Sequence, residues 1–162
     1  MSESPVLARL KRLVPDAVED IAEEFGDVRV TVQLDHLKRV MGRLLNDEVL
    51  GAAVLSDLIA IARGRHPRHF ELLYALAWPE WQYRLVVKVV LQAPVNRVDS
   101  VTGIWPCADW LEREVWDLYG IEFEGHPNLR RILLPGDFEG HPLRGDDSPP
   151  DNAPRAREYG GS

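Results

Sequence analysis

Residues 69–91 read H-F-E-L-L-Y-A-L-A-W-P-E-W-Q-Y-R-L-V-V-K-V-V-L, and the fold follows from this stretch more than from any other. Two runs rich in apolar and β-branched residues, 69–77 and 82–91, flank the sequence Trp78-Pro79-Glu80-Trp81. Proline presets a turn-like backbone angle and donates no ladder hydrogen bond, so these four residues predict a turn. We therefore expect an antiparallel pair of strands here.

The flanking sequence predicts further strands and helices. Residues 28–32 alternate β-branched and polar side chains, as a half-buried strand does. The expected elements are a helical region at 4–24 ending before Gly26, a strand at 28–32, a helix at 37–45 capped by Asp35, a strand at 52–62, a helical turn at 100–105 and a helix at 109–119. This order predicts an α+β fold, with helices on one face of a mainly antiparallel sheet and an extended C-terminal arm.

The chain has 162 residues, enough for one domain with a substantial core. Regular periodicity is lost after Gly120, and the last residues read S-P-P-D-N-A-P-R-A-R-E-Y-G-G-S. We expect an α+β domain over residues 1–120, an extended docking arm over 121–147 and a disordered tail over 148–162. An arm without its own core is expected to lie on its own domain or on a partner.

Composition narrows the function classes. The net charge is −7, and residues 109–162 hold 6 Lys+Arg against 12 Asp+Glu. This acidic third argues against nucleic acid or anionic lipid as the main partner, because neutralising phosphates requires a basic surface. No apolar run approaches the roughly 20 residues of a membrane-spanning helix. A single cysteine, Cys107, which is expected to be buried, and the lack of a visible secretory signal predict a cytoplasmic location.

The helix at 109–119 carries several candidate site residues. Asp109 is placed to cap it, with Glu112 bonding back as in a capping box, and Gly120 is placed to end it. The positions expected to face the sheet, at i, i+4 and i+7, are Leu111, Val115 and Leu118.

The carboxylates of this helix allow two interpretations. Paired carboxylates can perform general acid–base chemistry, so a hydrolase that uses Glu112, Glu114 or Asp117 is one alternative. A hydrolase normally holds its acid and base on separate elements across a cleft. Carboxylates on one helix more often cap it or pair with arginine, and we favour this structural role.

The pentapeptide F-E-G-H-P occurs twice, at residues 123–127 and 138–142, and each copy leads into Leu-Arg. Zinc needs about four ligands, and the surroundings of His126 and His141 offer no such set. Gly-His-Pro instead predicts a tight turn whose histidine binds a loop carbonyl or a carboxylate, followed by a buried Leu and an Arg that reaches a carboxylate. The chain has no phosphate-binding glycine loop and no C-x-x-C pair, so we expect no cofactor in it.

A longer pattern runs through these residues: Glu112-Arg113-Glu114-x-x-Asp117-Leu118-Tyr119, six residues, His126, three residues and Arg130-x-Ile132-Leu133, continued by P-G-D-F-E-G-H-P-L-R. Over about residues 99–147 the chain resembles the C subunit, also called the 30 kDa subunit, of proton-pumping NADH:quinone oxidoreductase (respiratory complex I). That family commonly continues Pro-Leu-Arg with Lys and Asp. Here Gly145 follows Arg144 in place of that Lys, so the sequence does not decide whether a basic contact forms after the second repeat.

The resemblance implies a peripheral-arm subunit without a cofactor, needed for assembly. It would dock on the large quinone-site subunit (the D subunit), near the iron–sulfur subunits, in a complex that passes electrons from NADH through FMN and iron–sulfur clusters to quinone. The chain would reach the membrane only through that complex, on its cytoplasmic side. An alternative is the equivalent subunit of an energy-converting hydrogenase or of a quinone or phenazine reductase that does not use NADH. The residues that match the motif, and are expected at the partner interface, are Glu112, Arg113, Glu114, Asp117, His126, Pro127, Arg130, Arg131, His141, Pro142, Leu143 and Arg144.

Overall fold

The computed structural model describes residues 4–24, 27–63, 69–92 and 94–144. Its main elements are α1 (Pro5–Leu13), β1 (Val18–Glu24), β2 (Asp27–Val32), α2 (Leu37–Leu45), β3 (Val54–Arg63), β4 (His69–Trp78), β5 (Tyr83–Gln92), β6 (Arg97–Asp99), α3 (Ala108–Tyr119) and β7 (Glu122–Glu124). Short 3₁₀ turns, Leu34–His36, Leu50–Ala52 and Pro79–Trp81, precede α2, β3 and β5. None of the helices in the described ranges is long and apolar enough to cross a membrane.

Five strands form one sheet in the order β1-β2-β5-β4-β3, and every neighbouring pair is antiparallel except β2 with β5. The expected hairpin is present, since β4 and β5 pair without interruption from His69 opposite Gln92 to Trp78 opposite Tyr83. Gln82 closes the turn with a positive φ of 49°. The predicted α+β class with a mainly antiparallel sheet is therefore confirmed.

Two local predictions were wrong. Residues 18–24 form strand β1, although their apolar residues have helical spacing. Pairing with β2 along nearly the whole strand satisfies the backbone groups of β1 that face β2 and overrides the weak helical pattern. Asp35 lies inside the 3₁₀ turn before α2, and the N-cap position belongs to His36, which makes no capping bond with its side chain. Gly26, expected to end the first helix, lies outside the described residues.

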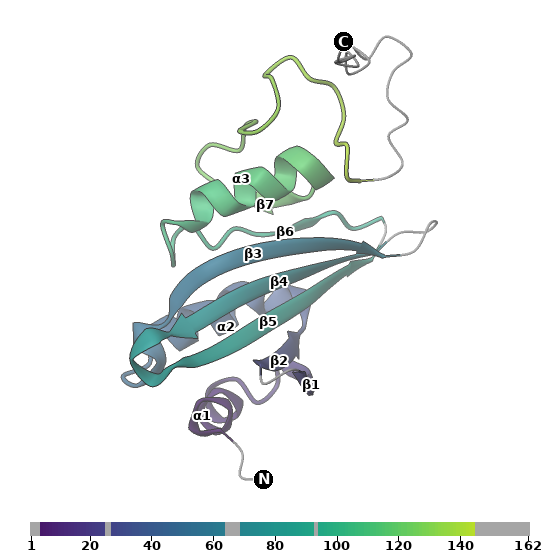
Figure 1. The fold of residues 1–162 in the computed structure, drawn as a ribbon. Helices are drawn as coiled ribbons and strands as arrows, with labels where there is room; N and C mark the ends of the chain where they lie inside the picture. Colours follow the sequence, from purple (N-terminus) through teal and green to yellow (C-terminus); the bar gives the residue numbers. More distant parts are fainter. Residues whose placement is uncertain (1–3, 25–26, 64–68, 93, 145–162) are drawn as a thin grey trace, which may run out of the picture.

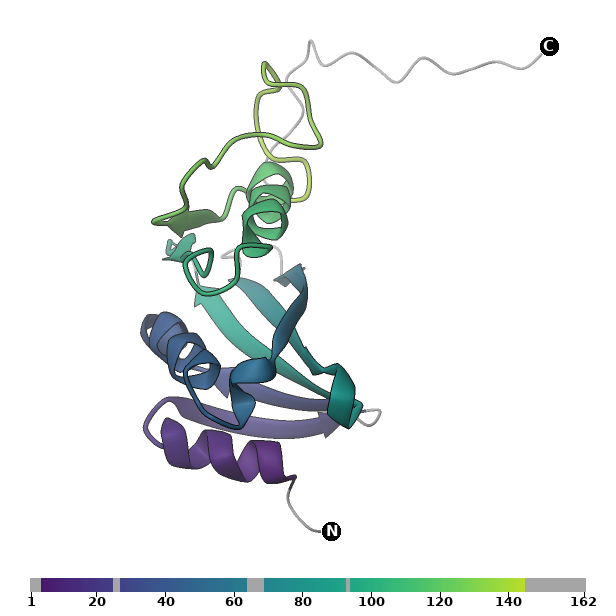
Figure 2. The same ribbon diagram turned by 90° about the vertical axis from the view of Figure 1, so that its left-hand side faces the viewer.

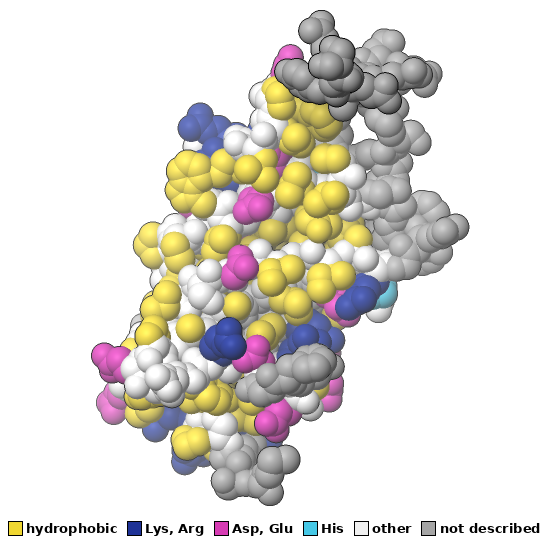
Figure 3. All heavy atoms as spheres, in the orientation of Figure 1, with side chains coloured by type: hydrophobic (Ala, Val, Ile, Leu, Met, Phe, Trp, Pro, Cys, Tyr) yellow, Lys and Arg dark blue, Asp and Glu magenta, His cyan; other side chains and the backbone are white. Residues whose placement is uncertain are grey.

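Helices α1 and α2 pack on the same face of the sheet, while no helix of the described ranges covers the opposite face (Figures 1 and 2). The alternating burial of β4 and β5 reflects this arrangement: Leu72, Tyr74 and Leu85 are fully buried, whereas their sequence neighbours are only half-buried or exposed. Figure 3 shows that the uncovered face displays many apolar side chains among charged ones.

Helix α3 packs beside β3, at the edge of the sheet (Figure 1). The turn before α3 covers backbone groups of that edge, since Trp105 Nε1 donates to Ala53 O at 3.1 Å and Cys107 Sγ lies 3.6 Å from Leu55 O. An open edge strand can pair with another chain, and this cover occupies acceptors at the beginning of the β3 edge. Cys107, predicted to be buried, is exposed at this position.

A strand also follows Gly120, where the sequence predicted no regular element. Strand β7 pairs in parallel with β6, and both Ile121 and Phe123 are buried. Residues 125–144 contain turns and bends but no helix or strand, and we call them the C-terminal loop.

Candidate functional site

Helix α3 and the C-terminal loop hold all twelve residues that the sequence singled out. The helix begins after Cys107, which makes no capping bond with its side chain, so Asp109 and Glu112 do not form the predicted capping box. Gly120 ends the helix with a φ of 71°, as predicted. Glu112, Arg113 and Asp117 of this helix are buried, and each binds a different part of the chain.

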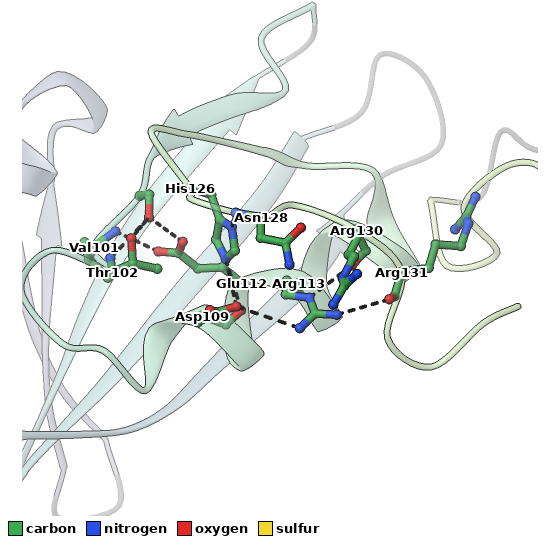
Figure 4. Close-up of polar contacts among 10 residues, drawn as sticks. Val101, Thr102, Asp109, Glu112, Arg113, His126, Asn128, Arg130 and Arg131 are labelled. Atoms are coloured by element: carbon green, nitrogen blue, oxygen red, sulfur yellow. Dashed lines mark hydrogen bonds and ion pairs between the residues drawn. The ribbon is translucent and has the colours of Figure 1, made fainter. Parts of the chain in front are cut away.

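Glu112 binds the turn that follows β6. One carboxylate oxygen accepts a hydrogen bond from Ser100 Oγ at 2.7 Å, and the other accepts from the Val101 N–H at 2.7 Å (Figure 4). Burial raises the pKa of Glu112 to about 7, although these two hydrogen bonds act in the opposite direction. The buried side chain of Glu112 thus connects α3 to the turn that follows β6.

Arg113 binds the backbone of the C-terminal loop. Its Nε donates to Arg130 O at 3.2 Å and its Nη2 donates to Arg131 O at 3.3 Å (Figure 4). The guanidinium also lies 5.0 Å from the centre of the Trp110 ring, within the range of a cation–π contact. Because a guanidinium presents several donors in a fixed plane, it can hold two successive carbonyl groups at once.

Asp117 is the centre of the second contact between helix and loop. Its Oδ1 accepts from Arg131 Nη1 at 2.7 Å, and its Oδ2 accepts from the N–H groups of Ile132, Leu133 and Leu134 at 3.2, 2.8 and 2.9 Å. Three successive N–H groups form an anion-binding nest. Burial opposes ionisation of Asp117, but these hydrogen bonds outweigh it and hold the pKa of the carboxyl below its usual value.

Loop residues also satisfy the last carbonyl groups of α3, which have no partner within a helix. His141 Nδ1 lies 3.0 Å from Asp117 O, and the Leu143 N–H donates to Leu118 O at 2.8 Å. A Cβ at Gly120 would lie 2.7 Å from the His141 ring, so both the close approach and the positive φ require glycine there.

His126 fixes the loop to the first turn of α3. Its Nδ1 accepts from the Asn128 N–H at 3.0 Å, so in the neutral ring Nε2 carries the proton. Nε2 lies 3.2 Å from Asp109 O and 3.4 Å from Asp109 Oδ1 (Figure 4). Each histidine lies near a main-chain carbonyl, but that carbonyl belongs to α3, at Asp109 and at Asp117, and not to a loop as predicted. In the described part of the chain, no group of three or more His, Cys, Asp or Glu is arranged to hold a metal ion.

The remaining motif residues lie at the surface. The exposed ones are Glu114, Pro127, Arg130, Pro142 and Leu143, and Arg144 is half-buried near Gly120. Two predictions fail here: Leu143 is 48% exposed instead of buried, and the arginine that reaches a carboxylate after the first repeat is Arg131 instead of Arg130. Whether any of these residues contacts a partner remains a prediction.

Sequence reasoning missed several residues of this site. Ser100 and Phe138 had no assigned role, yet Ser100 binds Glu112 and the Phe138 ring lies 5.3 Å from the Arg131 guanidinium. Phe138 begins the second F-E-G-H-P repeat, so the repeat could have identified it as a site residue. Ser100 gave none, because its partner is distant in sequence.

The molecule is thus a small α+β domain whose edge helix holds a C-terminal loop through two buried charged side chains, Arg113 and Asp117. The chain belongs to the 30 kDa subunit family of respiratory-chain NADH dehydrogenase, because residues 30–152 match the family described as "Respiratory-chain NADH dehydrogenase, 30 Kd subunit". This family is that of the C subunit of NADH-quinone oxidoreductase, as the sequence motif indicated.

Individual relatives belong to the same family. The C subunit of NADH-quinone oxidoreductase from Roseiflexus sp. (strain RS-1) is 41% identical over 147 residues, which is 90% of this chain and 84% of the relative. The corresponding subunit from Rhizobium rhizogenes is 39% identical over 123 residues, or 76% of this chain, but the match spans only 61% of that longer protein.

Two solved structures have similar folds. The trypsin-resistant fragment (1-134) of Nqo5 is 30% identical with a TM-score of 0.63, over 76% of this chain and 99% of the fragment. A chain of the membrane-bound sulfane sulfur reductase, an archaeal respiratory membrane complex, has a TM-score of 0.67 over 86% of this chain and 78% of its own length. Its identity is 21%, so this second likeness shows the fold alone.

Proposed function

We propose that this chain is a cofactor-free subunit of the peripheral arm of proton-translocating NADH:quinone oxidoreductase. In this role it supports assembly and docks through α3 and the C-terminal loop on the large quinone-site subunit, near the iron–sulfur subunits. The complex transfers electrons from NADH through FMN and iron–sulfur clusters, all held by partner subunits, to quinone. The chain takes no part in that chemistry and meets the membrane on its cytoplasmic side only through its partners.

One observation carries the proposal: three charged motif residues of α3, Glu112, Arg113 and Asp117, are buried, while large apolar residues of α3 and the loop are exposed. Trp110, Leu133, Phe138 and Leu143 are 62%, 58%, 37% and 48% exposed. The inward contacts of Arg113 and Asp117 fix the backbone from which these side chains project. Rigid apolar and aromatic side chains on a preorganised backbone are typical of the energetic centre of a protein interface.

A scaffold role in a complex with another electron donor is the second candidate. The same fold occurs in the membrane-bound sulfane sulfur reductase, so the fold does not by itself indicate NADH. Identities near 40% over most of the chain favour the NADH-quinone oxidoreductases. A free-standing hydrolase has little support, because Glu112 and Asp117 are buried with separate partners and only Glu114 faces solvent.

The experiment compares the exposed side chains at matched positions. Leu133→Ser removes an exposed apolar side chain but keeps the N–H that binds Asp117. We expect the purified variant to melt like the wild type, while at least tenfold less of it co-purifies with the large quinone-site subunit and membrane NADH:quinone activity falls in parallel.

Val95→Ser is the control, because Val95 is 44% exposed but lies outside α3 and the loop. Equal recovery of the large quinone-site subunit with both variants would refute docking through this surface.

A further inference from the structure

Helices α1 and α2 form a second surface, separate from that of α3, and it is rich in basic residues. Helix α1 contains Arg9, Lys11 and Arg12, helix α2 contains Lys38, Arg39 and Arg43, and neither helix contains an acidic residue. The chain as a whole has a net charge of −7, so this concentration of basic residues is local. Both helices lie on the same side of the sheet (Figure 2).

A shallow groove of about 650 Å³ runs between these helices. Its lining includes Arg9 and Leu13 from α1, Lys38, Gly42 and Arg43 from α2, and Asn46 directly after α2. Lys38, Gly42 and Asn46 are spaced at i, i+4 and i+8, so they follow one another along the same face of α2. The groove thus has basic rims and a floor without a side chain at its centre.

Some of the basic side chains are already neutralised within the chain. Arg9 Nε donates to Asp47 Oδ1 at 2.7 Å, and Arg39 Nη2 donates to Asp16 Oδ2 at 2.8 Å. Lys38 and Arg43 form no ion pair with any described residue, and Glu48 is the one further acidic residue that lines the groove. The groove therefore retains an excess positive charge.

Gly42 is not explained by the chain itself. It lies in the interior of α2, where glycine is among the least favourable residues. Its φ is not positive, and a Cβ built at this position would have no atom within 4 Å. Neither backbone conformation nor internal packing requires glycine there, whereas the close approach of a second helix would, because small residues allow two helix axes to come near each other.

From these observations we propose that the groove between α1 and α2 is a second docking surface, which binds an acidic α-helix of another protein. Acidic side chains of that helix pair with Lys38 and Arg43, and its backbone passes close to Gly42. This surface lies on α1 and α2, apart from the α3 surface, so the two interfaces can be tested separately.

Two glycine substitutions separate folding from docking. Gly42→Ala improves helix propensity, so the isolated chain is expected to melt at a higher temperature, yet co-purification of its partner subunits should fall at least threefold. Gly42→Leu should lower co-purification at least tenfold. Gly103→Ala is the matched control, because a Cβ there also meets no atom within 4 Å. If both Gly42 variants co-purify partners as the control does, the proposal is overturned.

The occupant is identified with the photo-reactive residue benzoylphenylalanine in place of Asn46, which lines the groove without carrying one of its charges, in the intact complex purified from membranes. Mass spectrometry should find a cross-link to an acidic helical segment of another subunit. A cross-link to phospholipid, to a non-acidic segment or to a second copy of this chain would overturn the proposal, as would the absence of any cross-link. If Leu133→Ser co-purifies its partners like the wild type while the Gly42 variants do not, docking through α3 is refuted and docking in this groove is supported.

Discussion

Replacing Asp117 with asparagine is expected to release the C-terminal loop from α3. The side chain of Asp117 has no solvent exposure and that of Arg131 has 11%, so the pair is buried. An amide cannot accept both from Arg131 and from the three N–H groups, since one of its two terminal atoms is a donor. Removing one partner of a buried pair costs about 3–5 kcal/mol, because it leaves the other charge uncompensated.

Hydrogen exchange measures this loss at the affected residues. The amides of Ile132, Leu133 and Leu134 donate to Asp117 and should be protected in the wild type. At about 1.4 kcal/mol per tenfold change, the variant should exchange these amides roughly 100- to 4,000-fold faster. Amides of the β4–β5 hairpin should keep their protection, because the loop opens locally.

Glu114→Gln is the matched control on the same helix, since Glu114 is exposed and should leave exchange unchanged. A double-mutant cycle with Arg131→Gln should show strong coupling, because both side chains share one bond. Unaltered exchange at residues 132–134 in Asp117→Asn would refute the claim that this carboxylate holds the loop.

Two further predictions concern the same helix. Glu112 has a native pKa of about 7, above its usual 4.5, so its contribution to stability is fully present below pH 4.5 and is lost as the pH rises through 7. The difference amounts to about 3 kcal/mol, and urea unfolding of the wild type against Glu112→Gln across this range should show it as a slope that the variant lacks. Gly120→Ala should destabilise the protein by more than about 1 kcal/mol, since the new Cβ meets the His141 ring at a positive φ; unfolding as stable as that of Gly103→Ala would contradict this.

The sheet could be predicted where the sequence was unambiguous. The hairpin of β4 and β5 was predicted correctly, because a proline turn joins its two apolar runs. Strand β1 was not predicted. It lies at the edge of the sheet and has few apolar residues, and their spacing also fits a helix. Strand β7 was missed because it has three residues and takes its stability from pairing with β6. Such pairing between distant segments leaves little local signal.

The site was predicted as a set of residues but not as a set of contacts. The motif identified α3 and the loop, and Gly-His-Pro indicated histidines that bind carbonyls, although these carbonyls belong to α3 and not to a loop. The partners of Glu112 could not be predicted. The capping box relates residues within one helical turn, whereas Ser100 and Val101 lie before α3 and approach Glu112 only in the folded chain. Arg131 could not be told from Arg130, because neighbouring arginines in an irregular loop have no periodicity that assigns their direction.

The inward direction of the charges explains why a docking surface would contain so many of them. Backbone N–H and carbonyl groups of an irregular loop need partners, and a loop without a core of its own cannot supply them. Arg113 satisfies two loop carbonyls, and Asp117 satisfies three loop N–H groups. Apolar side chains in these positions could do neither. Arg113 and Asp117 therefore hold the loop backbone in one shape, and the apolar side chains exposed on it, such as Leu133, are those that we propose to meet a partner.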